Sequence, residues 1–420
     1  MKVEIITIGD ELLIGQTIDT NSAWMGRELS NLGFALNRRT AVADAAEDIK
    51  SAIGEAFGRV DLVILTGGLG PTKDDITKKT LCELYGCGLR RDEHVLAHLS
   101  RLFEKRGRQL LEINKIQADL PELCETLTNE VGTAPGMWFD QNGKVLVSMP
   151  GVPNEMMHIM TERVFPRLKN RFSTGTILHR TLLTINIAES LLSNHLESFE
   201  SALPDGFTLA YLPALNTVKL RLTSRSEGAE PDAQMDKLFH TLCELCREWM
   251  FAPEDVVPAR YMARMFLENN LRFTLAESCT GGYIANQLLL EPGVSAICDG
   301  AQITYSNAVK MRELGVPESI FSTVGAVSEE CARYMADGIR KKMGADVAIS
   351  TTGIAGPGGA TPEKPVGLIY IGVSTAQQTV VKKYKLFGTR EQFMQRACNC
   401  AMQLTMQVLK GEAAMISDSI

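Results

Sequence analysis

Ser278 and the residues after it could carry out nucleophilic catalysis. Ser278 follows a short apolar run, so its hydroxyl is expected on a strand-to-helix turn, exposed above a sheet edge. The residues that follow lie at a helix N-terminus, where their free N–H groups could form an oxyanion hole. These residues are Thr280, Gly281 and Gly282. Ser278 could instead cap the helix, and Cys279 is a rival nucleophile that could equally be a small buried residue.

A base for this serine has to come from residues other than histidine. All six histidines lie at or before His240, so a Ser-His-Asp triad confined to the last third of the chain is excluded. Lysine with tyrosine is the available alternative. Tyr305 and Lys310 flank a second predicted helix start, and the helix dipole there favours a neutral, basic amine at Lys310. A solvated charge at Lys310 and a core position for Tyr305 are the alternatives.

Backbone-rich loops and carboxylates elsewhere suit phosphate ligands. The loop 353–359 offers such a surface in the last third of the chain. Near the N-terminus, two glycine-rich turns (67–72 and 150–153) could cradle a phosphate at a helix N-terminus. Asp10 and the pair Asp74 and Asp75 would repel that phosphate unless a cation such as Mg²⁺ lay between them. Alternatively, one aspartate of the pair caps the helix and leaves the other free.

The amino-acid composition indicates which classes of partner the chain can bind and in which cell compartment it is expected. The chain has 420 residues, 45% of them hydrophobic, and a net charge of −7, which makes general nucleic-acid binding improbable. No stretch approaches 18 apolar residues, and we expect no membrane span. Ten scattered cysteines favour reduced thiols and a cytoplasmic location. Cys243 and Cys246 lack a second pair to complete a zinc site, and His94 with His98 fits a solvated or partly packed helix face better than a metal site.

The helices and strands that position these candidate residues are predicted to form three domains. Residues 1–172 should form an α/β domain with a parallel sheet, residues 175–252 a small α+β (KH-like) linker domain, and residues 256–415 a second α/β domain. Ligands then belong at the carboxyl ends of the parallel strands. The middle domain contains no Gly-x-x-Gly loop, so an RNA-clamping role is unsupported, and it should act as a spacer or dimerisation module.

The spacing of apolar residues predicts the elements of each domain. In the first domain we expect strands 3–8, 61–66 and 145–149, with helices 21–32, 75–85 and one from 154. In the second we expect strands 179–187, 207–212 and 217–223, with helices 190–199 and 234–250. In the third we expect strands 273–276, 300–304 and 346–351, the antiparallel pair 366–374 and 379–387, and helices 259–269, from 283, and 391–408.

The chain resembles the CinA (competence/damage-inducible protein A) family over nearly its whole length, and its first domain resembles the molybdopterin-binding fold. Six motifs in the family's order carry the N-terminal part of this resemblance: Thr7-x-Gly9-Asp10-Glu11-Leu12-Leu13-x-Gly15, Asp19-Thr20-Asn21-Ser22, Thr66-Gly67-Gly68-Leu69-Gly70-Pro71-Thr72-x-Asp74-Asp75, Asn114-x-x-Gln117-Ala118, Gly132-Thr133-Ala134-Pro135-Gly136 and Met149-Pro150-Gly151-Val152-Pro153-x-Glu155. For this domain the resemblance implies hydrolysis of ADP-ribose to AMP and ribose 5-phosphate with a divalent metal (Mg²⁺, Mn²⁺ or Co²⁺).

The C-terminal domain resembles the nicotinamide-nucleotide amidase domain of CinA proteins. The matching motifs are Ala276-Glu277-Ser278-Cys279-Thr280-Gly281-Gly282, Thr304-Tyr305-Ser306-Asn307-x-x-Lys310, Gly325-Ala326-Val327-Ser328 and Gly353-Ile354-Ala355-Gly356-Pro357. This implies hydrolysis of nicotinamide mononucleotide to nicotinic acid mononucleotide and ammonia, without a metal. Ser278 is then the nucleophile, Lys310 and Tyr305 are its proton-transfer partners, and water hydrolyses an acyl-enzyme.

Site residues are predicted by combining the motifs with this resemblance. The predicted metal ligands are Asp10, Asp74 and Asp75. The predicted nucleotide contacts are Asn21, Gly67, Gly68, Gly70, Thr72, Pro150 and Gly151 in the first domain and Thr280, Gly281, Gly282, Thr352, Gly353, Gly356 and Arg390 in the third. Many relatives carry a second Arg four residues after Arg390, where this chain has Met394, so no role is assigned to Arg396.

The resemblance, together with an amphipathic helix in the middle domain, predicts a homodimer, and the implied ligands are small nucleotides. The net charge of −7 argues against direct binding of nucleic acid, and no contact with membranes is expected. One alternative remains open at this point. The first domain could hold a pterin or nucleotide without turnover, and the chain would then act through protein partners in DNA uptake or repair. Binding of single-stranded DNA at low salt would favour that alternative.

Overall fold

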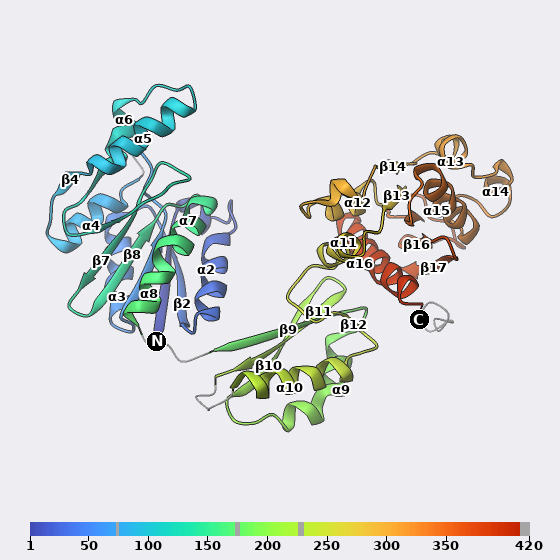
Figure 1. Ribbon diagram of the computed structural model, residues 1–420, viewed down its shortest axis with the longest axis horizontal. Helices are drawn as coiled ribbons and strands as arrows, with labels where there is room; N and C mark the ends of the chain where they lie inside the picture. Colours follow the sequence, from blue (N-terminus) through green and yellow to red (C-terminus); the bar gives the residue numbers. More distant parts are fainter. Residues whose placement is uncertain (73–74, 173–176, 226–230, 412–420) are drawn as a thin grey trace. The chain divides into compact units, whose positions relative to one another are not determined.

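The computed structural model describes residues 1–72, 75–172, 177–225 and 231–411. The chain divides into two compact units. The first comprises Met1–Leu178 with Ser224–Pro231, and the second comprises His179–Thr223 with Asp232–Ile420. Figure 1 shows the helices and strands of each unit.

A six-stranded sheet forms the centre of the first unit, with strand order β2-β1-β3-β8-β7-β6. Its strands are β1 (Lys2–Ile8), β2 (Ala35–Val42), β3 (Leu62–Thr66), β6 (Glu125–Leu127), β7 (Gly136–Gln141) and β8 (Lys144–Met149). The first four strands in that order pair in parallel, and β7 and β6 continue the sheet antiparallel. The predicted α/β class with a parallel sheet is confirmed, although the antiparallel edge was not predicted.

Helices cover both faces of this sheet because each central strand is apolar on both sides. Alternate residues of β3 belong to separate buried clusters, Leu62 and Ile64 to one and Val63 and Leu65 to the other. The elements around the sheet are α1 (Asp10–Leu13), α2 (Thr20–Asn31), α3 (Ala46–Phe57), α4 (Thr77–Tyr85), β4 (Leu89–Arg91), α5 (Glu93–Lys105), α6 (Glu112–Lys115), β5 (Asp119–Pro121), α7 (Pro153–Ile159) and α8 (Phe165–Arg171). Helices α2, α7 and α8 pack on one face, and α3, α4 and α5 pack on the other (Figure 1).

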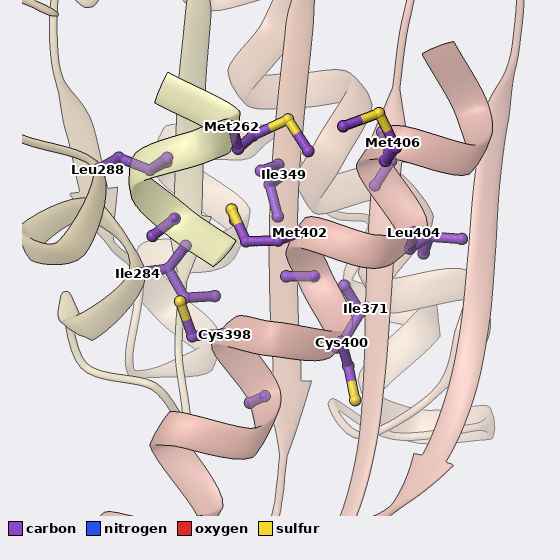
Figure 2. Close-up of a cluster of buried hydrophobic side chains, with 14 of the residues drawn as sticks. Met262, Ile284, Leu288, Ile349, Ile371, Cys398, Cys400, Met402, Leu404 and Met406 are labelled. Atoms are coloured by element: carbon purple, nitrogen blue, oxygen red, sulfur yellow. The ribbon is translucent and has the colours of Figure 1, made fainter. Parts of the chain in front are cut away.

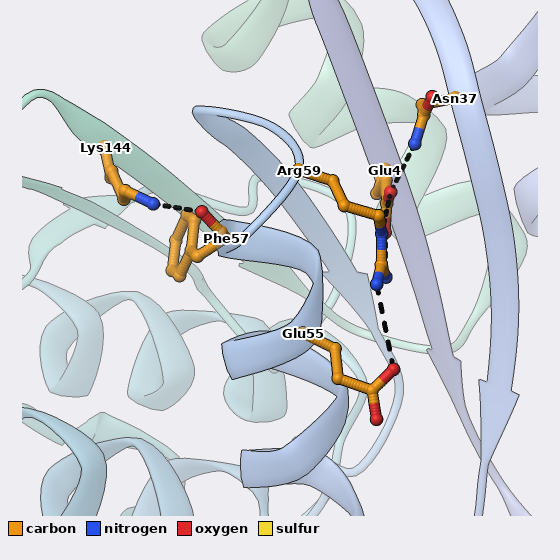
Figure 3. A network of polar contacts seen from close by, with 6 residues as sticks. All are labelled: Glu4, Asn37, Glu55, Phe57, Arg59 and Lys144. Carbon is orange, nitrogen blue, oxygen red and sulfur yellow. Dashed lines mark hydrogen bonds and ion pairs between the residues drawn. The ribbon is translucent and has the colours of Figure 1, made fainter.

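A buried carboxylate ties the end of α3 to β1. Glu4 is only 1% exposed, and the Arg59 guanidinium donates to both of its carboxylate oxygens at 2.9 Å (Figure 3). Asn37 of β2 adds a third hydrogen bond, at 2.5 Å. The Arg59 contact holds the pKa of Glu4 below its ordinary value. Nearby, the Lys144 amine donates to the carbonyl of Phe57.

The second unit begins with a four-stranded sheet of order β10-β11-β9-β12. Its elements are β9 (Leu178–Ile185), α9 (Glu189–Ser201), β10 (Phe207–Ala214), β11 (Thr217–Ser224), α10 (Pro231–Leu245) and β12 (Met250–Ala252). The predicted helix 234–250 is too long, because α10 ends at Leu245 and Met250 pairs with β9 instead. Burial of Phe251 and Ala252 in the apolar cluster that also holds β9 residues favours this strand over a longer helix.

A five-stranded sheet of order β14-β13-β15-β16-β17 follows. Its strands are β13 (Phe273–Glu277), β14 (Ala301–Ile303), β15 (Val347–Gly353), β16 (Leu368–Ser374) and β17 (Thr379–Lys385). Its helices are α11 (Pro258–Glu268), α12 (Tyr283–Leu289), α13 (Asn307–Leu314), α14 (Glu318–Thr323), α15 (Glu329–Met343) and α16 (Arg390–Leu409). Strands β13, β14 and β15 are parallel, and the predicted antiparallel pairing of the last two strands is confirmed.

The long helix α16 fills one face of this sheet. Its Met402 lies near Met262 of α11 and Ile349 of β15, whereas Cys398 lies near Ile284 of α12 and Cys400 near Ile371 of β16 (Figure 2). All ten cysteines are free of disulfides, and the two on α16, Cys398 and Cys400, are buried core residues. Helix α15 covers the opposite face and leaves the carboxyl ends of β13 and β15 available for a site.

Candidate functional site

Ser278 and Lys310 are in direct contact at the carboxyl end of β13. Ser278 is the first residue after that strand, and Lys310 lies on α13. The Lys310 amine is 3.0 Å from the Ser278 hydroxyl oxygen. It also donates to the backbone carbonyls of Thr304, at 2.7 Å, and Tyr305, at 3.0 Å. Lys310 is 1% exposed, so the alternative of a solvated surface charge is wrong.

Burial makes the Lys310 amine easier to deprotonate than that of an exposed lysine. Burial lowers its pKa from the ordinary value of 10.5, although the thiols of Cys331 and Cys279 oppose the shift. A neutral amine has two N–H donors and one lone pair. Once deprotonated, the amine can donate to the two carbonyls and direct its lone pair at the Ser278 hydroxyl, from which it can accept the proton. The arrangement is therefore that of a nucleophile with its base.

Two of the N–H groups predicted to form an oxyanion hole are already used. The Gly281 N–H donates to the Ser278 carbonyl at 3.1 Å. The Gly282 N–H donates to the Glu277 carboxylate at 3.0 Å. The prediction is wrong for these two glycines, because the Ser278 carbonyl takes up the N–H of Gly281 and the buried Glu277 carboxylate takes up that of Gly282. Cys279 is an inert rival, since burial raises the pKa of its thiol to about 12.

Tyr305 is brought to the site, but its hydroxyl contacts an arginine. The side chain is 61% exposed, so the alternative of a core residue is wrong. Its hydroxyl accepts a hydrogen bond from Arg390 at 3.2 Å, while its backbone carbonyl accepts from Lys310. Arg390 also donates to the Gly356 carbonyl at 2.9 Å. The arginine thus joins the Tyr305 loop to the glycine loop 353–359.

Thr351 and Thr352 at the end of β15 complete this site. Thr351 was missed in the sequence, yet its hydroxyl is 2.7 Å from that of Thr280, and its carbonyl accepts from the Ser278 N–H at 3.1 Å. The Thr352 hydroxyl instead donates to the Ala326 carbonyl. The hydroxyl run directly before a glycine loop was the available signal for Thr351. Glu277 was missed as well, although an acidic residue ending an apolar strand is a signal of its own.

Glycines shape a separate cavity of about 730 Å³ in the first unit. Predicted residues on its wall are Asp10, Gly67, Gly68, Gly70, Asp75, Pro150 and Gly151. A side chain at Gly67 would meet the Ile8 carbonyl at 2.2 Å, and one at Gly68 would meet the Thr77 hydroxyl at 2.2 Å. The loop can therefore lie this close to β1 and α4 only with glycine at both positions.

Asn21 and Thr72 support this cavity without lining it. The Asn21 amide donates to the Gly151 carbonyl at 2.7 Å and to the Thr66 hydroxyl at 3.3 Å, which joins the ends of β3 and β8. The Thr72 hydroxyl donates to Asp75 at 2.5 Å. In the structure both side chains act on the loops rather than on the space where a ligand would lie.

The carboxylates at this cavity differ from the prediction in their contacts. Asp75 accepts from the N–H groups of Gly70, at 2.7 Å, and Thr72, at 2.9 Å, so it holds the loop. It does not cap the helix, because α4 begins at Thr77 after Ile76. Asp74 lies outside the described residues. Asp10 and Asp44 accept from each other's backbone N–H, and Asp44 was missed in the sequence.

A metal in this cavity would need ligands from its substrate. Within the described ranges, no group of three or more His, Cys, Asp or Glu side chains is arranged to hold an ion. Asp10 and Asp44 supply two neighbouring carboxylates, and Mg²⁺ is commonly held by one or two carboxylates with phosphate oxygens. Burial, followed by the charges of Asp10, Glu11 and Asp75, raises the pKa of Asp44. A donor set of this kind fits a cation shared with a phosphate.

The histidine and cysteine pairs of the sequence make packing contacts in the structure. The His98 ring nitrogen is 3.2 Å from the Gly132 carbonyl, so it packs against a loop as expected. Cys246 is buried in the core of the middle sheet, with Cys243 packed against it. Among the described helices, none is long and apolar enough to cross a membrane.

Comparisons with known proteins agree with this layout. Residues 4–170 match the family described as "Probable molybdopterin binding domain", and residues 257–409 match "CinA C-terminal domain". A CinA-like protein of Cytophaga hutchinsonii is 43% identical over 408 residues, which are 97% of this chain and 98% of the relative. A CinA-like protein of Gemmatimonas aurantiaca is 40% identical over 418 residues, which are 98% of this chain and 97% of the relative.

One similar solved structure is that of the protein CinA from Thermoplasma acidophilum. It is 35% identical, with a TM-score of 0.37, and the match covers 41% of this chain and 98% of that chain. The two domain matches and the near full-length identity to the CinA-like relatives support a nucleotide-processing role. The chain belongs to the CinA family.

Proposed function

We propose that the C-terminal domain is a serine amidase that hydrolyses nicotinamide mononucleotide to nicotinic acid mononucleotide and ammonia. The observation that carries the proposal is the buried contact of 3.0 Å between the Lys310 amine and the Ser278 hydroxyl. The substrate comes from the resemblance to nicotinamide-nucleotide amidases. Arg390 and the glycine loop that it contacts would receive the phosphate.

In the proposed reaction, Lys310 takes up and returns a proton in each half of the cycle. The neutral amine takes the Ser278 proton while the serine oxygen bonds to the carboxamide carbon and gives a tetrahedral intermediate. The Lys310 ammonium then protonates the amide nitrogen, the C–N bond breaks, and ammonia leaves an acyl-enzyme. Lys310 next takes a proton from water, whose oxygen attacks the ester carbon, and it returns that proton to Ser278 as the acid leaves.

In this proposal Tyr305 does not transfer a proton to or from Ser278, which was its predicted role. Its backbone carbonyl orients the Lys310 amine, and its hydroxyl lies with Arg390. The exposed ring therefore belongs to the substrate entrance, and Lys310 is the group that transfers the proton.

Ammonia release in excess EDTA tests the amidase. We expect release from nicotinamide mononucleotide by wild type and none by Ser278→Ala or Lys310→Met. Asp337→Asn is a matched control, because Asp337 lies in the same domain and accepts a hydrogen bond from Ser374, at the opposite end of the sheet from Ser278. No release by a folded wild type would overturn the proposal and return attention to the non-catalytic alternative.

We further propose that the first domain hydrolyses ADP-ribose to AMP and ribose 5-phosphate with a divalent metal. The cavity of about 730 Å³ supports this, since it combines glycine-rich loops with carboxylates. Asp10 and Asp44 would hold the cation, which supplies charge neutralisation at the phosphates. Asp10→Asn and Asp44→Asn should raise the metal concentration needed for half-maximal turnover. Unchanged metal dependence in both variants would exclude these ligands.

A further inference from the structure

Glu277 is a buried carboxylate that no step of the proposed reaction uses. It ends β13, stands directly before Ser278 and is only 1% exposed. An uncompensated charge at this depth is strongly unfavourable, so its contacts must stabilise it. The hydrogen bonds of Glu277 therefore indicate its structural role.

The Glu277 side chain binds the first turn of α12. One carboxylate oxygen accepts from the N–H groups of Gly282, at 3.0 Å, and Ile284, at 3.2 Å. The other accepts from Ala285 at 2.8 Å. Helix termini leave such N–H groups without helical partners. The carboxylate thus holds the far end of the turn 278–282, whose near end follows Glu277 directly in the chain and carries the nucleophile.

Two N–H groups remain after this assignment. Within the described part of the chain, no other residue accepts a hydrogen bond from the backbone N–H groups of Cys279 and Thr280, and the only contact of the Cys279 N–H is with its own thiol. Both residues are buried, at 5% and 1% exposed, and unpaired buried N–H groups are rare. The N–H of the residue after a nucleophilic serine is a common oxyanion donor.

The Glu277 backbone reaches the base as well. Its carbonyl accepts from the Thr304 N–H at 2.8 Å, and the Thr304 carbonyl accepts from the Lys310 amine at 2.7 Å. The side chain of Glu277 therefore contacts the turn that carries Ser278, and its backbone contacts Thr304, which binds the Lys310 amine.

We propose that Glu277 is a positioning residue whose carboxylate holds the turn 278–282, so that the N–H groups of Cys279 and Thr280 form the oxyanion hole beside Ser278. The proposal rests on the amidase activity proposed above. Glu277 touches no reacting atom, and its effect passes through the turn.

Two substitutions separate the geometry of Glu277 from its charge. Glu277→Gln keeps the shape but replaces one acceptor oxygen with an NH₂ group, which cannot accept from the α12 N–H groups. Glu277→Asp keeps the charge but is one methylene too short. We expect kcat to fall about 10²-fold in both variants, as when an oxyanion donor is lost, with KM unchanged.

The pH profile and a control variant exclude a general loss of stability. The ascending limb of kcat/KM should stay in place in Glu277→Gln, since burial is the main cause of the Lys310 pKa shift and Glu277 is not among the groups that shift it. Asp337→Asn should lower the melting temperature without the loss of kcat. A shifted limb, a loss in KM alone, or an equal kcat loss in the control would overturn the positioning role.

A fluorophosphonate probe separates this proposal from the choice of substrate. The probe labels an activated serine and needs the oxyanion hole, but not the nucleotide. We expect rapid labelling of Ser278 in wild type and labelling about 10²-fold slower in Glu277→Gln. If wild type labels but releases no ammonia, the substrate is wrong and the positioning role stands. Equal labelling rates, or no labelling of wild type, would overturn the role.

Residue-resolved amide exchange of the wild type covers the case in which the Glu277 variants do not fold. The amides of Gly282, Ile284 and Ala285 should exchange slowly because the carboxylate holds them. Those of Cys279 and Thr280 should exchange faster. The reverse order would show that the N–H groups are assigned wrongly.

Discussion

Lys310 is an ordinarily cationic side chain that is buried beside a serine hydroxyl, and burial lowers its pKa. Its amine contacts two carbonyl oxygens and the Ser278 hydroxyl, which places it to exchange a proton with the serine. The sequence contained the three candidates Ser278, Tyr305 and Lys310, and the absence of histidine after residue 240 directed attention to the lysine. Their roles could not be separated there, because which oxygen of Tyr305 faces Lys310 depends on a turn that only the folded chain defines.

The pH dependence of the amidase should follow the neutral form of Lys310. Because burial lowers the pKa, kcat/KM should rise with pH and reach half its plateau below pH 10.5, the ordinary lysine value. Lys310→Arg stays protonated and should lose at least about 10²-fold of kcat. A pH–rate profile with nicotinamide mononucleotide measures both. A midpoint at or above the ordinary value would contradict a lysine base.

Gly68 and Gly86 make a matched pair for testing the glycine loop. Both have left-handed backbone, with φ of 64° and 63°. A side chain at Gly68 would meet the Thr77 hydroxyl at 2.2 Å, whereas one at Gly86 would meet nothing within 4 Å. Gly86→Ala should therefore cost only the backbone strain of about 1–2 kcal/mol, and Gly68→Ala should cost more. Urea unfolding measures the difference, and equal costs would show that the loop can move away.

At the scale of elements, the sequence predicted buried strands well and polar connections poorly. Apolar runs such as 62–66 form strands because both of their faces are covered. The first helical turns were less predictable, since side chains distant in sequence satisfy them. Asp75 binds the loop before α4, and Glu277 binds the start of α12. Neither glycine-rich turn therefore has all of the free N–H groups that its sequence predicts. A capping preference alone cannot reveal such contacts.

The pairing of Glu4 with Arg59 should make the first unit sensitive to acid. The pKa of Glu4 is lowered, so its contribution to stability is present above about pH 4.5 and is lost as pH falls through the folded pKa. Arg59→Ala should lower the urea midpoint at pH 7, and the difference from wild type should shrink at pH 3 (Figure 3). Glu55→Ala is the control, because it removes only an exposed ion pair of 3.7 Å. A difference independent of pH would argue against the ion pair.

At the scale of the whole molecule, the domain matches and the compact units divide the chain differently. The matches end at residue 170 and begin again at 257, whereas the second unit starts at His179 and includes the middle sheet. Leu183 and Ile185 of β9 lie in the same apolar cluster as α11 and α16. Composition could not show this, because the middle segment reads as an independent α+β module.

We also propose that the chain forms a homodimer, as the family resemblance implies. Sedimentation equilibrium should give twice the chain mass of 46.1 kDa at micromolar concentration. A mass of one chain across the concentration range would contradict it. The measurement matters for stability, since subunit association makes the melting temperature depend on concentration.

The two proposed reactions should be separable because their residues lie in different compact units. Asp10 belongs to the first unit and Ser278 to the second. Asp10→Asn should suppress ADP-ribose cleavage at low metal concentration and leave ammonia release near the wild-type rate. Ser278→Ala should do the reverse, and EDTA should abolish only the first reaction. Both activities are measured on both full-length variants. If either variant changed the kcat or KM of the other reaction, the sites would be coupled, and the full chain would have to be treated as one catalytic system.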